Sequence, residues 1–140
     1  MLEFTIPVAA RTKKNHGQIV TLKTGRTMML PSKQYREFEK EVVNFINKEF
    51  PNIEPIDKPI NLCCTFYKDK DYKADLMGYM QAIQDALVKA KLLLDDNHKI
   101  VASTDGSKVL LDRKNPRVEV SITFKEGVWI TLHTFAEAQN

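Results

Sequence analysis

The sequence predicts a single α+β domain in which a mixed β-sheet packs against two principal helices. Apolar residues alternate with polar ones in several short segments, and two longer segments repeat apolar residues at helical spacing. The length of 140 residues suits one domain with one core. Hydrophobic residues make up 43% and charged residues 28%, which excludes a disordered chain. No apolar run approaches the ~18 residues that a membrane-spanning helix needs.

The first half of the chain predicts a strand, a hairpin and a helix. Alternation marks a strand at the N-terminus, and residues 18–30 form a hairpin with Thr24 and Gly25 in its turn. Ser32 is placed to cap a helix that runs to about residue 49. The apolar positions of the strand are Leu2, Phe4, Ile6 and Val8, and those of the helix are Tyr35, Phe38, Val42, Phe45 and Ile46.

The second half predicts a strand, a helix and two further strands. Alternation marks strands at 60–66 and 118–124, and a short strand is expected at 99–103. Asp75 is placed to cap the second helix, whose apolar stripe consists of Leu76, Met80, Ile83, Leu87 and Ala90. We expect a core domain over about residues 2–124 and a C-terminal extension over 125–140, in which 128–132 can add an edge strand.

The cysteines and the N-terminus indicate a cytoplasmic protein. Cys63 and Cys64 are adjacent, so in a strand they point to opposite faces and an ordinary disulfide between them is geometrically poor. They are small strand residues in a reducing compartment. The N-terminus lacks the basic region and the long apolar stretch of a signal peptide.

Positive charge is concentrated near the N-terminus, although the net charge is only +3. Between Phe4 and Arg36 there is no Asp or Glu. Such an excess is expected of a surface that contacts phosphates, and a solvated basic face is the alternative. The cations of this stretch are Arg11, Lys13, Lys14, Lys23, Arg26, Lys33 and Arg36.

Carboxylates lie at both ends of the second helix. Asp75 begins it, and Asp95 and Asp96 follow it in a turn. A helix of this length spans ~22 Å, so the two groups meet only if the intervening segment runs back along the helix. If they meet, their oxygens suit Mg²⁺, which polarises a phosphate and generates hydroxide. The alternatives are a helix cap at Asp75 and ordinary turn chemistry at Asp95 and Asp96.

For two other Asp residues, the neighbouring sequence favours structural roles. Asp85 lies beside the apolar stripe of the second helix, where a partly buried carboxylate usually accepts hydrogen bonds from a neighbouring loop. Asp105 begins an Asp-Gly-Ser sequence that is typical of a turn.

The spacing of these carboxylates resembles the signature of the RusA-type Holliday junction resolvases over roughly residues 2–124. The motif consists of Asp75-Leu76, then Asp85-Ala86-Leu87, then Leu94-Asp95-Asp96. The resemblance implies a Mg²⁺-dependent homodimeric endonuclease, typical of phages and prophages, that acts on four-way junctions in recombination and repair. Mn²⁺ can substitute. It also implies that Asp75 and Asp96 are catalytic, with Asp95 beside them.

The sequence departs from the family pattern at three positions. Met77 stands where the family has its second Asp, Gly78 where it has Asn, and Gln81 where it has Lys. The Asp-Gly-Ser turn and the Asn115-Pro116-Arg117 sequence resemble a phage branch that also lacks the second Asp. Asp105 is therefore the candidate replacement carboxylate. The alternative is that activity is weakened or lost.

These observations favour an endonuclease in which Asp75, Asp95 and Asp96 bind Mg²⁺, with Asp105 as a further catalytic candidate. Lys13, Lys14, Lys23 and Arg26 are the expected contacts to the DNA backbone, and no membrane partner is expected. Branched DNA would be recognised by shape with few base contacts. Two rival hypotheses stay open: a catalytically inactive protein that binds branched DNA, and a structural protein whose carboxylates only cap and turn.

Overall fold

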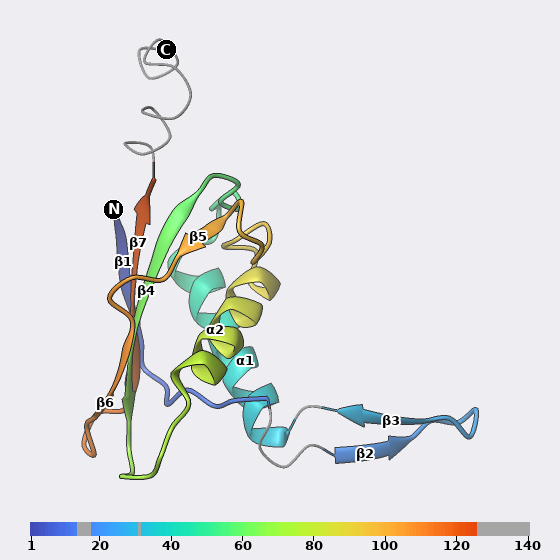
Figure 1. Ribbon diagram of the computed structural model, residues 1–140. Helices are drawn as coiled ribbons and strands as arrows, with labels where there is room; N and C mark the ends of the chain where they lie inside the picture. Colours follow the sequence, from blue (N-terminus) through green and yellow to red (C-terminus); the bar gives the residue numbers. More distant parts are fainter. Residues whose placement is uncertain (14–17, 31, 126–140) are drawn as a thin grey trace.

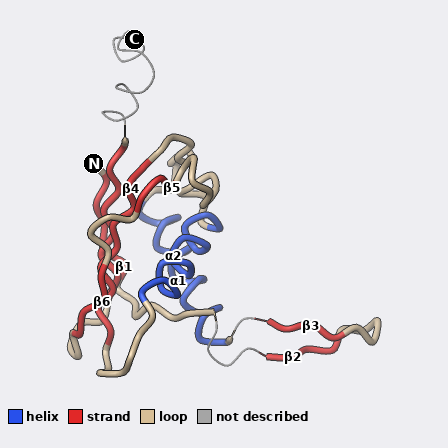
Figure 2. The backbone as a smooth tube through the Cα atoms, in the orientation of Figure 1, coloured by secondary structure: helices blue, strands red, loops and turns tan. Residues whose placement is uncertain are grey.

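A mixed β-sheet with both helices on one face forms the body of the protein (Figures 1 and 2). The computed structural model describes residues 1–13, 18–30 and 32–125. Its elements are β1 (Leu2–Ile6), β2 (Gln18–Thr21), β3 (Thr27–Leu30), α1 (Lys33–Glu49), β4 (Ile60–Lys68), α2 (Leu76–Lys89), β5 (Val101–Ser103), β6 (Lys108–Leu111) and β7 (Arg117–Phe124). The predicted α+β class is confirmed, and the edge strand expected at 128–132 lies outside the described residues.

The sheet has the order β1-β7-β4-β5, and β6 also pairs with β4. β7 is antiparallel to both β1 and β4, whereas β5 and β6 run parallel to β4. β5 pairs with the start of β4 at Ile60 and Asn61, and β6 pairs with its end from Thr65 to Lys68. Two short strands therefore cover one edge of β4, joined by a turn.

The β6 strand was not predicted. Its sequence, Lys108–Leu111, lacks the alternation of the core strands, and Leu110 and Leu111 are both about 40% exposed. Only its pairing with β4 makes it a strand. β5 is shorter than predicted, and β1 stops before Pro7, which has no backbone N–H to donate to a ladder.

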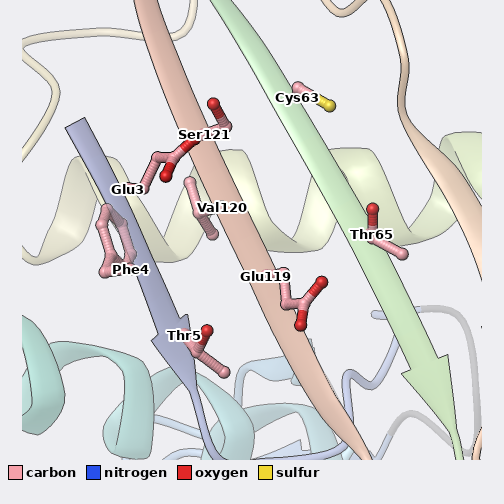
Figure 3. A pocket seen from close by; sticks show the side chains of 8 residues that line it. All are labelled: Glu3, Phe4, Thr5, Cys63, Thr65, Glu119, Val120 and Ser121. Carbon is pink, nitrogen blue, oxygen red and sulfur yellow. The ribbon is translucent and has the colours of Figure 1, made fainter. Parts of the chain in front are cut away.

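Alternation along β4 and β7 divides the sheet into a buried face and an open face. The buried side chains are Ile60, Leu62, Cys64, Phe66, Val118, Val120 and Ile122. They pack against the apolar sides of α1 and α2, which contribute Tyr35, Phe38, Val42, Ile46, Tyr79, Met80, Ile83 and Leu87. The open face carries Glu3, Thr5, Cys63, Thr65, Glu119 and Ser121, which line a shallow hollow of about 400 Å³ (Figure 3).

The adjacent cysteines lie on opposite faces of the sheet, as their spacing predicts. Cys64 is buried in the core, and burial raises the pKa of its thiol. Cys63 is half-buried on the open face, and neither cysteine forms a disulfide.

The helix starts are those that the sequence predicts. The Ser32 hydroxyl accepts a hydrogen bond from the Tyr35 backbone N–H at 3.1 Å. The Asp75 carboxylate accepts one from the Met77 backbone N–H, also at 3.1 Å. Both contacts satisfy donors that the first turn of a helix leaves without an intrahelical acceptor. Across the described residues, neither helix has the length and apolar character needed to cross a bilayer.

The hairpin β2–β3 projects away from the body (Figure 1). Its register pairs Gln18 with Leu30 and Thr21 with Thr27. Gly25 in the turn has a φ of 83°, a conformation that glycine adopts without steric cost. The predicted hairpin and its Thr24-Gly25 turn are confirmed.

Candidate functional site

Two of the motif carboxylates lie on one face of α2. The series Asp75, Gly78, Ala82 and Asp85 advances by three, four and three residues, the spacing of a single helical face. Asp75 is exposed at the N-terminus of the helix, and Asp85 is half-buried near its last turn. At 1.5 Å per residue the two positions are about 15 Å apart along the axis.

The chain segment after β1 lies across this face of α2. The Arg11 guanidinium is 4.0 Å from the Asp69 carboxylate, and the Lys13 Nζ is 2.6 Å from Asp85 Oδ2. Between them, a Cβ at Gly78 would lie 3.3 Å from Thr12 Cγ2 and 3.5 Å from Asp75 Oδ2. The absence of a side chain at position 78 thus lets Thr12 approach α2 beside Asp75.

Lys13 is held by two groups. Besides the ion pair with Asp85, its Nζ lies 5.4 Å from the centre of the Tyr35 ring at the start of α1. The interpretation of Asp85 as a helical carboxylate that bonds a neighbouring loop is confirmed by this contact. Lys13, which was expected to contact DNA, already has a protein partner. Lys14 lies outside the described residues.

The Asp95–Asp96 turn lies near the Asp85 end of α2. After the helix, the Leu92 carbonyl accepts a hydrogen bond from the Ile56 N–H at 2.8 Å, and the Leu94 N–H donates to the Ile56 carbonyl at 3.0 Å. This short pairing with Ile56 places residues 92–94 beside the loop that follows α1. The segment therefore does not run back to Asp75.

The two carboxyls of this turn differ in their electrostatics. The pKa of Asp95 is lowered because its carboxylate accepts hydrogen bonds from the Asp96 backbone N–H and from the Asn97 side chain. The pKa of Asp96 is raised by its partial burial, by its hydrogen bond with Asp95, and by the negative charge of Asp85. Asp96 is thus close enough to Asp85 for their charges to interact.

The carboxylate oxygens are suitable ligands for a divalent cation, but Asp75 lies at the start of α2 whereas Asp95 and Asp96 lie beyond its end. Oxygen ligands are what Mg²⁺ prefers, and no soft donor lies among them. In the described part of the chain, however, no three His, Cys, Asp or Glu side chains gather closely enough to hold a metal ion. A single ion bound by Asp75, Asp95 and Asp96 together therefore does not fit this arrangement.

Asp105 lies on the other side of the sheet. Its backbone N–H donates to Asn61 Oδ1 at 2.8 Å, and its carbonyl accepts from Asn61 Nδ2 at 3.1 Å. A Cβ at Gly106, whose φ is 88°, would lie 3.1 Å from Cys63 Sγ. Because Cys63 belongs to the open face and α2 covers the buried face, the sheet separates Asp105 from Asp75.

Two of the three positions that depart from the family pattern, Met77 and Gln81, are exposed. Met77 is 60% exposed in the first turn of α2, and Gln81 is exposed four residues later, one helical turn along the same side. Side chains of other kinds could therefore occupy both positions without disturbing the core.

The sequence reasoning missed a group of aromatic and charged side chains around the loop that leads into Asp75. The Tyr72 and Tyr79 hydroxyls are 2.7 Å apart, and Lys68 Nζ lies 4.8 Å from the centre of the Tyr72 ring. Tyr79 also stacks on Phe66, with ring centres 5.2 Å apart, and its burial raises its pKa. These contacts hold the loop that leads into Asp75. A tyrosine within an otherwise charged stretch was the only signal of it in the sequence.

One comparison with known proteins identifies the family. The family model described as Endodeoxyribonuclease RusA matches residues 6–123, most of the chain. The chain belongs to this family. RusA proteins are nucleases that resolve Holliday junctions, act on branched DNA and generally depend on a divalent metal. No individual curated protein matches the sequence.

The Lys13–Asp85 ion pair has a testable effect on the mobility of the segment that it holds. Asp85→Asn should lower the free energy of unfolding by less than about 1 kcal/mol, because both side chains are partly exposed. Trypsin should nevertheless cleave after Lys13 several times faster, since the segment loses its anchor on α2. Glu37→Gln, which removes the exposed Lys33–Glu37 pair, is the control and should leave this rate unchanged. Equal cleavage of wild type and Asp85→Asn would contradict the anchoring role.

Proposed function

We propose that this RusA-family protein is a Mg²⁺-dependent endonuclease that cuts four-way junctions and related branched DNA as a homodimer. The observation that carries the proposal is the approach of the basic N-terminal segment to Asp75, where the space beside Gly78 is bordered by both Thr12 and Asp75. An exposed carboxylate at the positive end of a helix and a chain segment rich in cations thus share one surface. We expect the protein to act in the cytoplasm.

The proposed roles divide between carboxylates and cations. Asp75 at the start of α2, and separately Asp95 and Asp96 in the turn after it, are the proposed catalytic and metal-binding carboxylates, because their separation does not suit one shared ion. Asp105 is a weaker candidate because Asn61 holds its turn on the open face. Lys23 and Arg26, exposed at the end of the hairpin, are proposed to hold DNA phosphates, and Lys13 and Lys14, which precede the hairpin in the sequence, are proposed to contribute. While Lys13 is paired with Asp85, it can bind a phosphate only through the ammonium hydrogens that do not point at Asp85.

The experiment that tests the proposal is cleavage of a synthetic four-way junction by the full chain. We expect paired nicks with Mg²⁺ or Mn²⁺, no product with EDTA, and no product from a linear duplex of the same sequence. Sedimentation of the protein alone and with the junction would test the dimer. A protein that binds the junction but never cuts it with any divalent metal would contradict the nuclease.

Salt dependence should identify the cations that contact phosphates. With ~4–6 phosphate contacts per protomer, log K for the junction should fall against log salt with a slope of about −4 to −5 per protomer. Lys23→Glu combined with Arg26→Glu should lower the affinity and flatten the slope by about 2, because two contacts are lost. Charge reversal at Lys40 and Lys48, exposed on α1, is the control. An unchanged slope in the hairpin variant would place the DNA surface elsewhere.

A catalytically inactive junction-binding protein is the alternative, and the exposed Met77 and Gln81 favour it. If their departure from the family pattern has degraded the site, Met77→Asp combined with Gln81→Lys should create or raise Mg²⁺-dependent cleavage. If the native carboxylates suffice, this double variant should gain little over a wild type that already cuts. Met77→Asn combined with Gln81→Met, which adds no charge, is the control. Cleavage rates of the three proteins on one junction decide between the two functions.

A further inference from the structure

The hairpin β2–β3 has apolar side chains that the rest of the described chain does not bury. Ile19 is 73% exposed, Met28 44% and Leu22 41%. The two strands form a sheet of their own, separate from the main sheet. An isolated two-stranded hairpin is only marginally stable in water. These side chains therefore suit a surface that becomes covered when a partner binds.

The strand register places Leu22 and Met28 on one side of the hairpin, together with Val20 and Leu30, and Ile19 on the other. Val20 pairs with Met28, and Gln18 pairs with Leu30. The Leu22 N–H donates to the Arg26 carbonyl at 2.7 Å, so Leu22 continues the same side toward the turn. We call this side, formed by Val20, Leu22, Met28 and Leu30, the apolar hairpin face. The opposite side carries Ile19, Thr21 and Thr27.

Charge indicates what kind of partner covers this face. The sequence from Phe4 to Arg36 contains no Asp or Glu, and Lys23 and Arg26 are exposed beside the apolar hairpin face. A second copy of the same hairpin would bring four cations together, which opposes self-association there. A polyanion is complementary to this combination of cations and apolar side chains.

The shape of the hairpin also suits DNA. The major groove is wide enough, at about 12 Å, for a two-stranded β-ribbon. Proteins that distort DNA insert Leu, Ile or Met side chains between base steps. Bases at a branch point lack a continuous stack on one side, so their apolar faces are accessible there at a lower cost than within a duplex.

We propose that the apolar hairpin face binds unstacked bases at the branch point, while Lys23 and Arg26 hold the adjacent phosphates. This inference rests on the proposed function, and it adds the means by which branched DNA is distinguished from linear duplex. The hairpin then supplies the preference for junctions, and the carboxylates of α2 have no part in it.

The test uses the full chain in EDTA and a four-way junction with 2-aminopurine beside the branch point. Wild type should raise the fluorescence of the 2-aminopurine and bind the junction in preference to a duplex. Leu22→Gln combined with Met28→Gln keeps the side chains long but makes them polar. This variant should lose the fluorescence change and roughly ten- to hundredfold of the preference for the junction. Its duplex affinity should stay unchanged because both cations remain.

Leu22→Met combined with Met28→Leu is the matched control and should behave as wild type. If the Gln variant keeps both the fluorescence change and the preference, the inference is wrong. It is also wrong if the Gln variant turns a dimer into a monomer in sedimentation, since a second copy would then cover the face. A loss of duplex affinity would show that the hairpin itself is disrupted, and Met28→Gln alone then decides by the same two readouts. Failure of wild type to bind any junction would instead contradict the proposed function.

Discussion

Asp75→Asn and Asp96→Asn should each lower the rate of junction cleavage by at least about 100-fold while leaving junction binding intact or stronger. Each change removes a negative charge that attracts a divalent cation at its own end of α2 and that repels the scissile phosphate. Asp75→Asn should fold normally, because Asn caps a helix about as well as Asp does and can accept the hydrogen bond from Met77. Single-turnover cleavage and equilibrium binding in EDTA, measured on one junction, separate the two effects.

Asp105→Asn tests the weaker catalytic candidate by the same two measurements. Its turn is held by backbone contacts to Asn61, which the substitution preserves, and the sheet separates it from Asp75. We therefore expect cleavage within a fewfold of the wild-type rate. If Asp105→Asn abolished cleavage, the turn would have to reach the site in the DNA complex. Wild-type rates for both Asp75→Asn and Asp96→Asn would contradict the proposed carboxylate roles.

Phe66→Ala should lower the free energy of unfolding by about 3–5 kcal/mol. Phe66 lies on the buried face of the sheet, is 1% exposed, and stacks on Tyr79 of α2. Its removal leaves a cavity between β4 and α2 and withdraws the support of the loop before Asp75. Urea unfolding monitored by circular dichroism, at constant pH and salt, measures the change.

Phe124→Ala provides the comparison at the end of an inner strand of the same sheet. Phe124 ends β7 and is 40% exposed, so much less apolar area is lost and the expected cost is under about 1.5 kcal/mol. Equal costs for the two substitutions would contradict the packing described for the buried face.

Local features of the chain were predictable because they depend on neighbours within a few residues. The caps at Ser32 and Asp75, the hairpin turn at Gly25, and the alternation of β4 and β7 all follow from such short-range rules. The partly buried Asp85 could be expected to bond a loop, although the sequence did not say that the loop residue would be Lys13. The two cations of the hairpin, Lys23 and Arg26, could also be read directly from the sequence.

The sequence by itself thus determined the fold class, the helix starts and which carboxylates are candidates; the tertiary structure decided which of them meet. Asp95 and Asp96 lie near Asp85 because residues 92–94 pair with Ile56, almost forty positions earlier. Asp105 lies on the open face because Asn61 binds its turn. Likewise, β6 forms a strand only because it pairs with β4. Each outcome depends on pairing between distant segments, whose geometry no local periodicity or cap encodes.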